Sequence, residues 1–157
     1  MLSLLPIFTV AVATFQAALT LCHAPPREPA PIEDLFAITA CTPPTVAGIA
    51  DQLRADFVPT FTTADLEELV CVHPYGFQVF EIDIALLRAG TQIDPGPARP
   101  LTGGGEAAMV LRNVFQSRPD LQPAEVAKWF VDFGPANNFR GIAEYKDGRI
   151  AVIYYRD

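Results

Sequence analysis

Two acidic residues at alternate positions are the first candidates for chemistry. Glu81 and Asp83 lie within the apolar segment 77–87. If this segment is a strand, both carboxylates project from one face, about 7 Å apart. A carboxylate pair is what glycoside hydrolysis requires, with one acting as the acid and the other as base or nucleophile. The pair also lies on the face of the strand opposite its apolar face. Solvated acidic residues are common on such a face, so Glu81 and Asp83 could equally be ordinary surface residues without a catalytic role.

A nucleophile beside a base is the second candidate. Cys71 and His73 are two residues apart, so on a strand they would share a face. No Asn or Asp is evident to orient the histidine, and a disulfide would consume the thiol. Serine hydrolysis is nearly excluded, because the only serines, Ser3 and Ser117, lack the Gly-x-Ser-x-Gly context.

Cofactor and metal motifs are weak in this chain. The glycine run 103–105 precedes a predicted helix but lacks the Lys-Ser/Thr of a phosphate-binding loop. It is more typical of a flexible connection. Beyond residue 24 the chain has two cysteines and one histidine without paired spacing, which argues against zinc. We therefore expect no cofactor and no metal.

Hydrophobic periodicity predicts the elements that would position these residues. Helices are expected over 45–57, 64–71, 106–117 and 123–133, from apolar stripes and from capping residues. Segment 32–41 is short and favours a helix slightly over a strand. A strand over 77–87 would place Phe80, Ile82, Ile84 and Leu86 on one face. No internal repeat is evident.

The C-terminal segment predicts a hairpin. Segments 139–146 and 149–156 flank Asp147-Gly148, which suits a two-residue type I′ turn. In this register Ile142 lies opposite Ile153, and Tyr155 follows on the same face. An apolar centre with charged neighbours resembles an interface, with Tyr155 as its anchor. Helices that cover the face would instead make it a second core layer, and both alternatives stay open.

The order of these elements is not a regular βα alternation. It predicts an α+β fold, with a small antiparallel sheet of three or more strands, including the C-terminal hairpin, and helices packed on one face. We expect three segments: a signal peptide over 1–24, a Pro-rich arm over 25–34 and a single domain over 35–157.

The first 24 residues contain no Asp, Glu, Lys or Arg and are mostly apolar. An apolar start that ends in small residues is typical of a cleaved secretory signal. We expect cleavage between Thr20 and Pro25. An uncleaved membrane anchor and a buried helix are the alternatives. After cleavage we expect no stable membrane insertion.

The three cysteines agree with secretion. Cleavage removes Cys22 and leaves Cys41 and Cys71, an even pair in an oxidising compartment. A disulfide between them would close a loop of about 30 residues, which stabilises a fold by roughly 3 to 4 kcal/mol. Two buried free thiols are the alternative.

The charge balance restricts the class of partner. The chain carries a net charge of −7, which argues against nucleic acid as a partner. A signal, a Pro-rich arm, one small domain and few cysteines together resemble the small secreted effector proteins of plant-associated fungi. The resemblance implies a secreted, non-enzymatic protein that binds a partner protein of a host. A secreted enzyme inhibitor would have the same organisation, and a small extracellular hydrolase using Glu81 and Asp83 is the enzymatic alternative.

Overall fold

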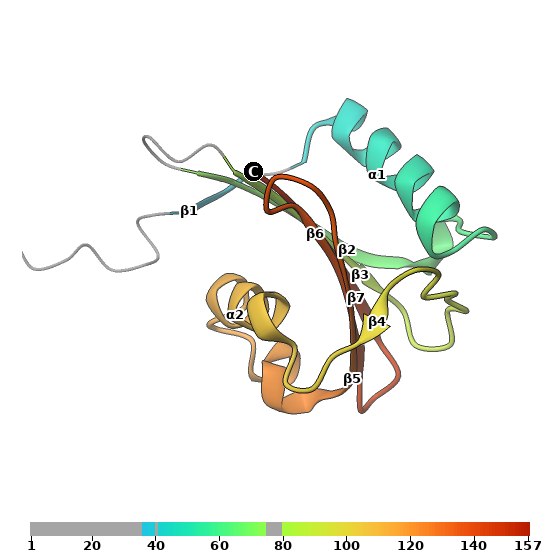
Figure 1. The fold of residues 1–157 in the computed structure, drawn as a ribbon. Helices are drawn as coiled ribbons and strands as arrows, with labels where there is room; N and C mark the ends of the chain where they lie inside the picture. The colour runs from blue at the N-terminus through green and yellow to red at the C-terminus, as the bar shows by residue number, and fades with distance from the viewer. Residues whose placement is uncertain (1–35, 40, 75–79) are drawn as a thin grey trace, which may run out of the picture. The chain divides into compact units, whose positions relative to one another are not determined.

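The computed structural model describes residues 36–39, 41–74 and 80–157 (Figure 1). Its centre is a seven-stranded sheet in the order β1-β2-β3-β7-β6-β5-β4, in which all neighbouring strands are antiparallel. The strands are β1 (Phe36–Thr39), β2 (Leu66–Pro74), β3 (Glu81–Leu87), β4 (Arg99–Pro100), β5 (Val126–Phe133), β6 (Phe139–Tyr145) and β7 (Ile150–Arg156). The α+β class and the C-terminal hairpin are thus confirmed. The predicted signal and the predicted arm both lie outside the described residues.

Two helices cover opposite faces of this sheet (Figure 1). They are α1 (Pro43–Asp56) and α2 (Gly105–Val114), and the short 3-10 turns are η2 (Thr63–Asp65), η3 (Pro119–Leu121) and η4 (Pro123–Glu125). The prediction that the helices pack on one face is therefore wrong. The helices predicted over 45–57 and 106–117 are confirmed as α1 and α2. The strand predicted over 77–87 is confirmed over Glu81–Leu87 as β3, and its predicted start, 77–79, lies outside the described residues.

A hydrophobic core lies on each side of the sheet. On the α1 side, Leu53 and Phe57 pack in a cluster with residues of β3, β6 and β7. On the α2 side, Leu111 and Phe115 pack in a second cluster with other residues of the same strands. Because successive strand residues alternate between faces, β3 and β7 contribute to both cores. This explains why their apolar residues run almost continuously along the sequence.

The chain folds as two copies of one unit, although the sequence shows no repeat. The order α1-η2-β2-β3 recurs as α2-η4-β5-β6, with one additional turn, η3, between α2 and η4. At the end of α1 the Phe57 amide donates to the Leu53 carbonyl, and 58 residues later the Phe115 amide donates to the Leu111 carbonyl. A register shift after Leu66 in β2 recurs 60 residues later after Val126 in β5. We therefore treat 43–87 and 105–145 as equivalent units.

Equivalent residues of the two units lie on opposite faces. Leu69 packs in the α1 core, whereas its equivalent Trp129 packs in the α2 core. In the same way, Cys71 packs in the α1 core and its equivalent Val131 packs in the α2 core. An approximate two-fold axis in the sheet plane along β7, which lies between β3 and β6, relates the units. This rotation carries one helix to each face.

Two predicted helices, over 64–71 and 123–133, are wrong. Their start signals are real: the Thr62 amide donates to the Asp65 carboxylate over 2.7 Å. However, they begin only the single turns η2 and η4, and strands β2 and β5 follow. A β-bulge in β2 puts Leu66 and Leu69 on the α1 side, so two residues three apart share a face as in a helix. The slight preference for a helix over 32–41 is also wrong, since Phe36–Thr39 is strand β1.

The hairpin between β6 and β7 has a different turn from the predicted one. The Tyr145 amide donates to the Arg149 carbonyl over 2.9 Å, which encloses a three-residue loop. Gly148 has φ +89°, whereas Asp147 is not among the residues with positive φ. A type I′ turn needs positive φ at both positions, so the loop is instead a three-residue turn that ends in a left-handed glycine. The register therefore slips by one residue and pairs Ile142 with Val152.

The predicted pairing of Cys41 with Cys71 is confirmed as a disulfide, with the Cα atoms 5.4 Å apart. Cys41 precedes α1 by two residues, and Cys71 lies in β2 within the α1 core. The bond therefore ties the start of α1 to the sheet. No such bond is possible in the second unit, where Val131 takes the place of Cys71.

Candidate functional site

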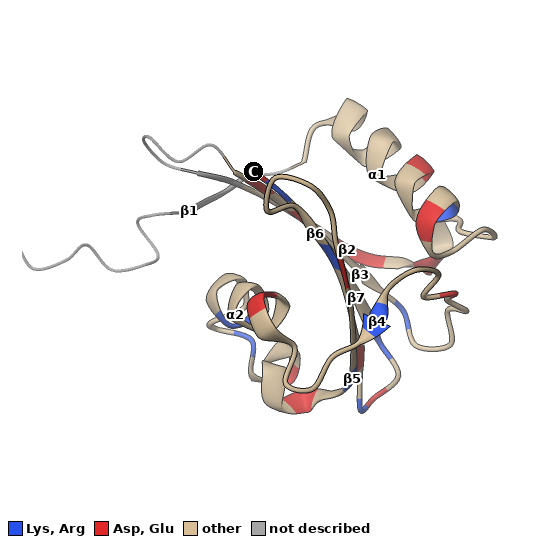
Figure 2. Ribbon diagram, in the orientation of Figure 1, with Lys and Arg blue, Asp and Glu red and all other residues tan. Residues whose placement is uncertain are grey.

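A row of polar side chains crosses the sheet beneath α1. Asp83, Tyr154, Arg140 and Asp132 lie on β3, β7, β6 and β5, and each is the register partner of the next. Direct partners in an antiparallel sheet project from the same face. Tyr154 packs in the α1 core, so this row, which we call the polar row, faces α1. Figure 2 shows acidic residues in the C-terminal half of α1, the helix that covers this face.

Ion pairs engage the charged side chains of the polar row. Arg140 bridges Asp132 and Asp56 of α1, the latter over 3.0 Å. Arg156 pairs with Asp83 and also with Glu81, the latter over 3.8 Å. Each arginine therefore holds two carboxylates, which favours a structural role for the row.

The structure separates the two carboxylates predicted from the sequence by their burial. Asp83 is 1% exposed, so the expectation of solvation is wrong for it. Glu81 is exposed, as expected. Both contact Arg156 and both line a pocket of about 410 Å³ beside α1. The pocket is lined by Pro44, Thr45, Gly48, Ile49, Gln52, Glu81, Asp83 and Arg156, and we call it the charged pocket.

Tyr154 is a buried polar group within the polar row. It is 2% exposed, and among the described residues its Oη atom has no hydrogen-bond partner. Burial raises its pKa above the usual value for tyrosine. Its ring lies 6.4 Å from that of Phe57, so its main contribution is to the α1 core.

Aromatic side chains form the next row, which faces α2. Phe133, Phe139 and Tyr155 are register partners on β5, β6 and β7. The rings of Phe139 and Tyr155 stack at 4.9 Å, and Phe80 stacks on Tyr155 at 5.5 Å. Phe133 continues the line at 6.4 Å from Phe139. The rings thus form a continuous row across the sheet.

Part of this row is open to solvent. Phe133 is 60% exposed and Met109 of α2 is 55% exposed, the two most exposed large hydrophobic residues of the described chain. Both line a pocket of about 380 Å³. We call this pocket, which is lined by Glu106, Met109, Val110, Phe133, Asn137, Phe139, Tyr155 and Asp157, the aromatic pocket.

The residues predicted to bind a partner do not form one surface. Ile142 and Ile153 are both fully buried, and they pack in different cores. The one-residue slip in register turns Ile142 toward α1 and Ile153 toward α2. Only Tyr155 remains partly exposed, at the aromatic pocket.

The sequence prediction missed Phe133 and Met109. The helix predicted over 123–133 would place Phe133 on its buried, apolar side. Had 126–133 been recognised as a strand, the alternation of Trp129, Val131 and Phe133 would have put all three on one face. No sequence signal marks Met109, since it lies on the outer side of a correctly predicted helix.

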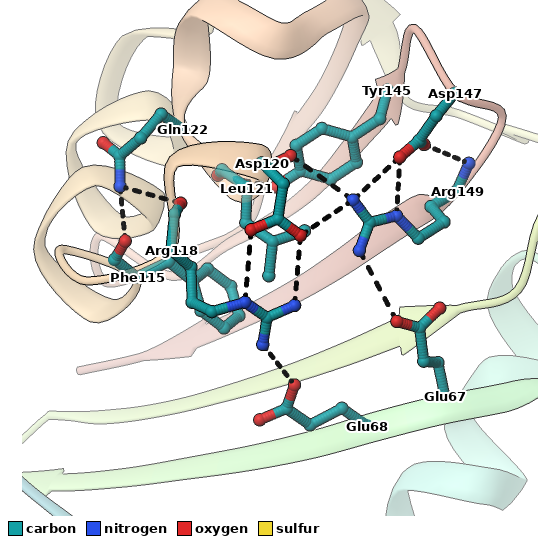
Figure 3. A network of polar contacts seen from close by, with 10 residues as sticks. All are labelled: Glu67, Glu68, Phe115, Arg118, Asp120, Leu121, Gln122, Tyr145, Asp147 and Arg149. Carbon is teal, nitrogen blue, oxygen red and sulfur yellow. Dashed lines mark hydrogen bonds and ion pairs between the residues drawn. The ribbon is translucent and has the colours of Figure 1, made fainter.

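A charged network occupies the opposite end of the strands (Figure 3). Its members are Glu67, Glu68, Arg118, Asp120, Asp147 and Arg149. Asp120 lies between the two arginines, 3.2 Å from Arg118 and 3.0 Å from Arg149. Hydrogen bonds from Arg118 and then Arg149 lower the pKa of Asp120 to about 2. The network connects the hairpin turn to η3 and β2, so we assign it a structural role.

The weaker sequence candidates have structural explanations. The thiol of Cys71 is consumed by the disulfide. Gly104 has φ +76°, and a Cβ atom there would lie 2.5 Å from the Trp129 ring. Chain geometry and packing therefore explain the glycine run without a bound phosphate.

The described part of the chain contains no group of three or more His, Cys, Asp or Glu residues that could hold a metal. None of its helices is long and apolar enough to cross a membrane. No protein-family model matches the chain, and no curated protein or solved structure matches it either. The site must therefore be judged by its geometry.

Proposed function

We propose that this chain is a secreted protein that acts by binding a partner protein at the aromatic pocket. The observation that carries the proposal is the exposure of Phe133 and Met109, 60% and 55%, around one concavity. Grouped exposed apolar side chains mark binding sites on soluble domains. Aromatic residues and methionine are also enriched at the centres of protein interfaces.

Two features support secretion within this proposal. The Cys41–Cys71 disulfide is typical of proteins that fold in an oxidising compartment. The charge-free apolar start has the pattern of a secretory signal. The narrower form of the proposal is an effector that acts on a host protein, and it rests on the organisation of the chain. If the partner is an enzyme, the same binding would make the protein an enzyme inhibitor.

The hydrolase is the second candidate, because Glu81 and Asp83 both line the charged pocket. We place it second because Arg156 contacts both carboxylates, which engages them in ion pairs. The aromatic pocket needs no rearrangement to receive a partner. Its apolar residues are already exposed.

Site-specific photocrosslinking tests the binding proposal. A photoreactive phenylalanine analogue replaces Phe133 in one sample and Val46, which is 36% exposed on α1, in the control. Both proteins are irradiated in the fluid where the protein naturally occurs. We expect a discrete protein adduct at position 133 only. Excess unlabelled wild-type protein should suppress this adduct, and the Phe133→Ser variant should not. Equal labelling from both positions would contradict the proposal.

A further inference from the structure

We infer that the aromatic pocket binds a linear segment of its partner in which a large apolar side chain lies next to Lys or Arg. This inference rests on the proposed binding function and specifies the chemistry of the partner. The apolar requirement follows from the rings of Phe133, Phe139 and Tyr155 and from Met109. The basic requirement follows from the charges at the same pocket.

Only carboxylates supply charge to the pocket. Its charged lining residues are Glu106 and Asp157, and no Lys or Arg lines it. Within the described chain, Glu106 has no ion-pair partner, so its carboxylate is available to a ligand. Asp157 is held in place, since its backbone amide donates to Asn138 Oδ1 over 2.6 Å and Asn137 donates to its carboxylate over 3.3 Å. A cation beside the apolar anchor would therefore gain charge complementarity.

The same carboxylates disfavour two other occupants. An anionic membrane surface attracts basic segments and would be repelled by Glu106 and Asp157. A second copy of this chain, docked across a two-fold axis, would bring identical acidic pockets together. Like charges in close apposition oppose such contact.

The dimensions of the pocket suit a short segment. Its volume of about 380 Å³ lies near the lower end of the range of about 300 to 1,000 Å³ that ligand pockets span. It can therefore enclose a few side chains but not a broad interface. The partner should thus contribute one anchor residue and its neighbours.

A display selection tests this specificity. A library of random dodecapeptides is selected against the purified protein produced from the full chain, and separately against Glu106→Lys, Phe133→Ser and the control Val46→Ser. For wild type and Val46→Ser we expect aromatic or aliphatic residues adjacent to Lys or Arg among the selected peptides. Peptides selected on wild type should bind Glu106→Lys about tenfold more weakly. They should lose measurable binding to Phe133→Ser.

The outcomes separate this inference from the proposed function. Peptides that depend on Phe133 but show no basic enrichment, and bind Glu106→Lys equally well, would overturn the inference and leave the binding function intact. Peptides that bind Phe133→Ser as well as wild type would contradict both. A selection that yields no peptide would overturn the inference of a linear segment, and photocrosslinking at position 133 would still decide the binding function. Tighter binding of anionic than of neutral vesicles would assign the pocket to a membrane. Concentration-dependent dimerisation lost in Phe133→Ser would assign it to a second copy.

Discussion

The charged pocket beside α1 and the aromatic pocket beside α2 occupy equivalent places in the two units of the fold. Gly48, Gln52 and Glu81 line the first, and the residues 58 positions later, Glu106, Val110 and Phe139, line the second. One pocket is therefore built from charges that pair with each other. Its counterpart is built from rings that lack a complete cover.

The two pockets also differ in the helix that lies beside each of them. α1 has 14 residues and α2 has 10, and the additional turn of α1 supplies Pro44 and Thr45 to the charged pocket. The Cys41–Cys71 bond ties that turn to the sheet. The second unit has neither the turn nor the bond, so its pocket keeps exposed apolar side chains. Under the proposed function, the first unit of the repeated fold serves stability and the second serves binding.

Removing the bond that is unique to the first unit should have the largest effect on stability. We expect the double variant Cys41→Ala/Cys71→Ala to lose about 3 to 4 kcal/mol in free energy of unfolding, because the bond closes a long loop. Urea unfolding followed by circular dichroism measures this loss. Peptide binding at the aromatic pocket, assayed where the variant remains folded, should be retained. An unchanged urea midpoint would show that the bond does not hold α1.

Breaking the polar row should have the next largest effect. Asp83 is 1% exposed, so Asp83→Ala should lower the free energy of unfolding by roughly 2 kcal/mol, since it leaves Arg156 without its buried partner. The matched control is Glu81→Ala, which removes the exposed carboxylate from the same arginine and should cost under about 0.5 kcal/mol. Equal losses from both variants would contradict the structural role of the polar row.

Changing the aromatic pocket should affect binding far more than stability. Phe133 is 60% exposed, so we expect Phe133→Ser to change the free energy of unfolding by less than about 0.5 kcal/mol. Thermal unfolding of the purified variant provides the measurement. A drop in midpoint comparable to that of Asp83→Ala would mean that Phe133 belongs to the core, and it would remove the contrast between the two pockets.

The charged network at the far end of the strands should contribute least to stability, and this contribution should be lost in acid. Its hydrogen bonds lower the pKa of Asp120 to about 2, below the ordinary value near 4. A lowered folded-state pKa means that this stability is present above about pH 4 and is lost as the pH falls toward 2. In Arg118→Gln the thermal unfolding midpoint should therefore fall slightly less than in wild type as the pH is lowered from about 4 to about 2. Equal falls in the two proteins would show that the contact with Arg118 contributes negligibly.

The α+β class, the two long helices, β3 and the disulfide could be predicted because each depends on local periodicity or on simple counting. β2 and β5 could not, because bulges after Leu66 and Val126 give a strand the apolar spacing of a helix. The real capping signal at Thr62 reinforced this error. The internal repeat has no sequence signal because equivalent positions carry different residue types, as with Cys71 and Val131, which are both buried.

The site was predictable only in part. Tyr155 was identified, but the aromatic pocket depends on a register that one glycine conformation sets. In the hairpin turn only Gly148 adopts positive φ, which makes the loop three residues long and shifts the register by one residue. Because of this shift, Ile142 and Ile153 lie on opposite faces of the sheet. Asp83 was found by its alternation with Glu81, but its burial depends on α1, which the sequence does not place on that face.

An NMR titration tests most directly whether the aromatic pocket, and not the charged pocket, is the binding site. A selected basic-apolar peptide is added to ¹⁵N-labelled protein, and backbone amide shifts are followed. We predict that the shifts cluster at Glu106, Met109, Phe133 and Tyr155 and leave Gly48 and Gln52 unchanged. Shifts centred on Gly48, Gln52 and Glu81 would place binding in the charged pocket and contradict the account.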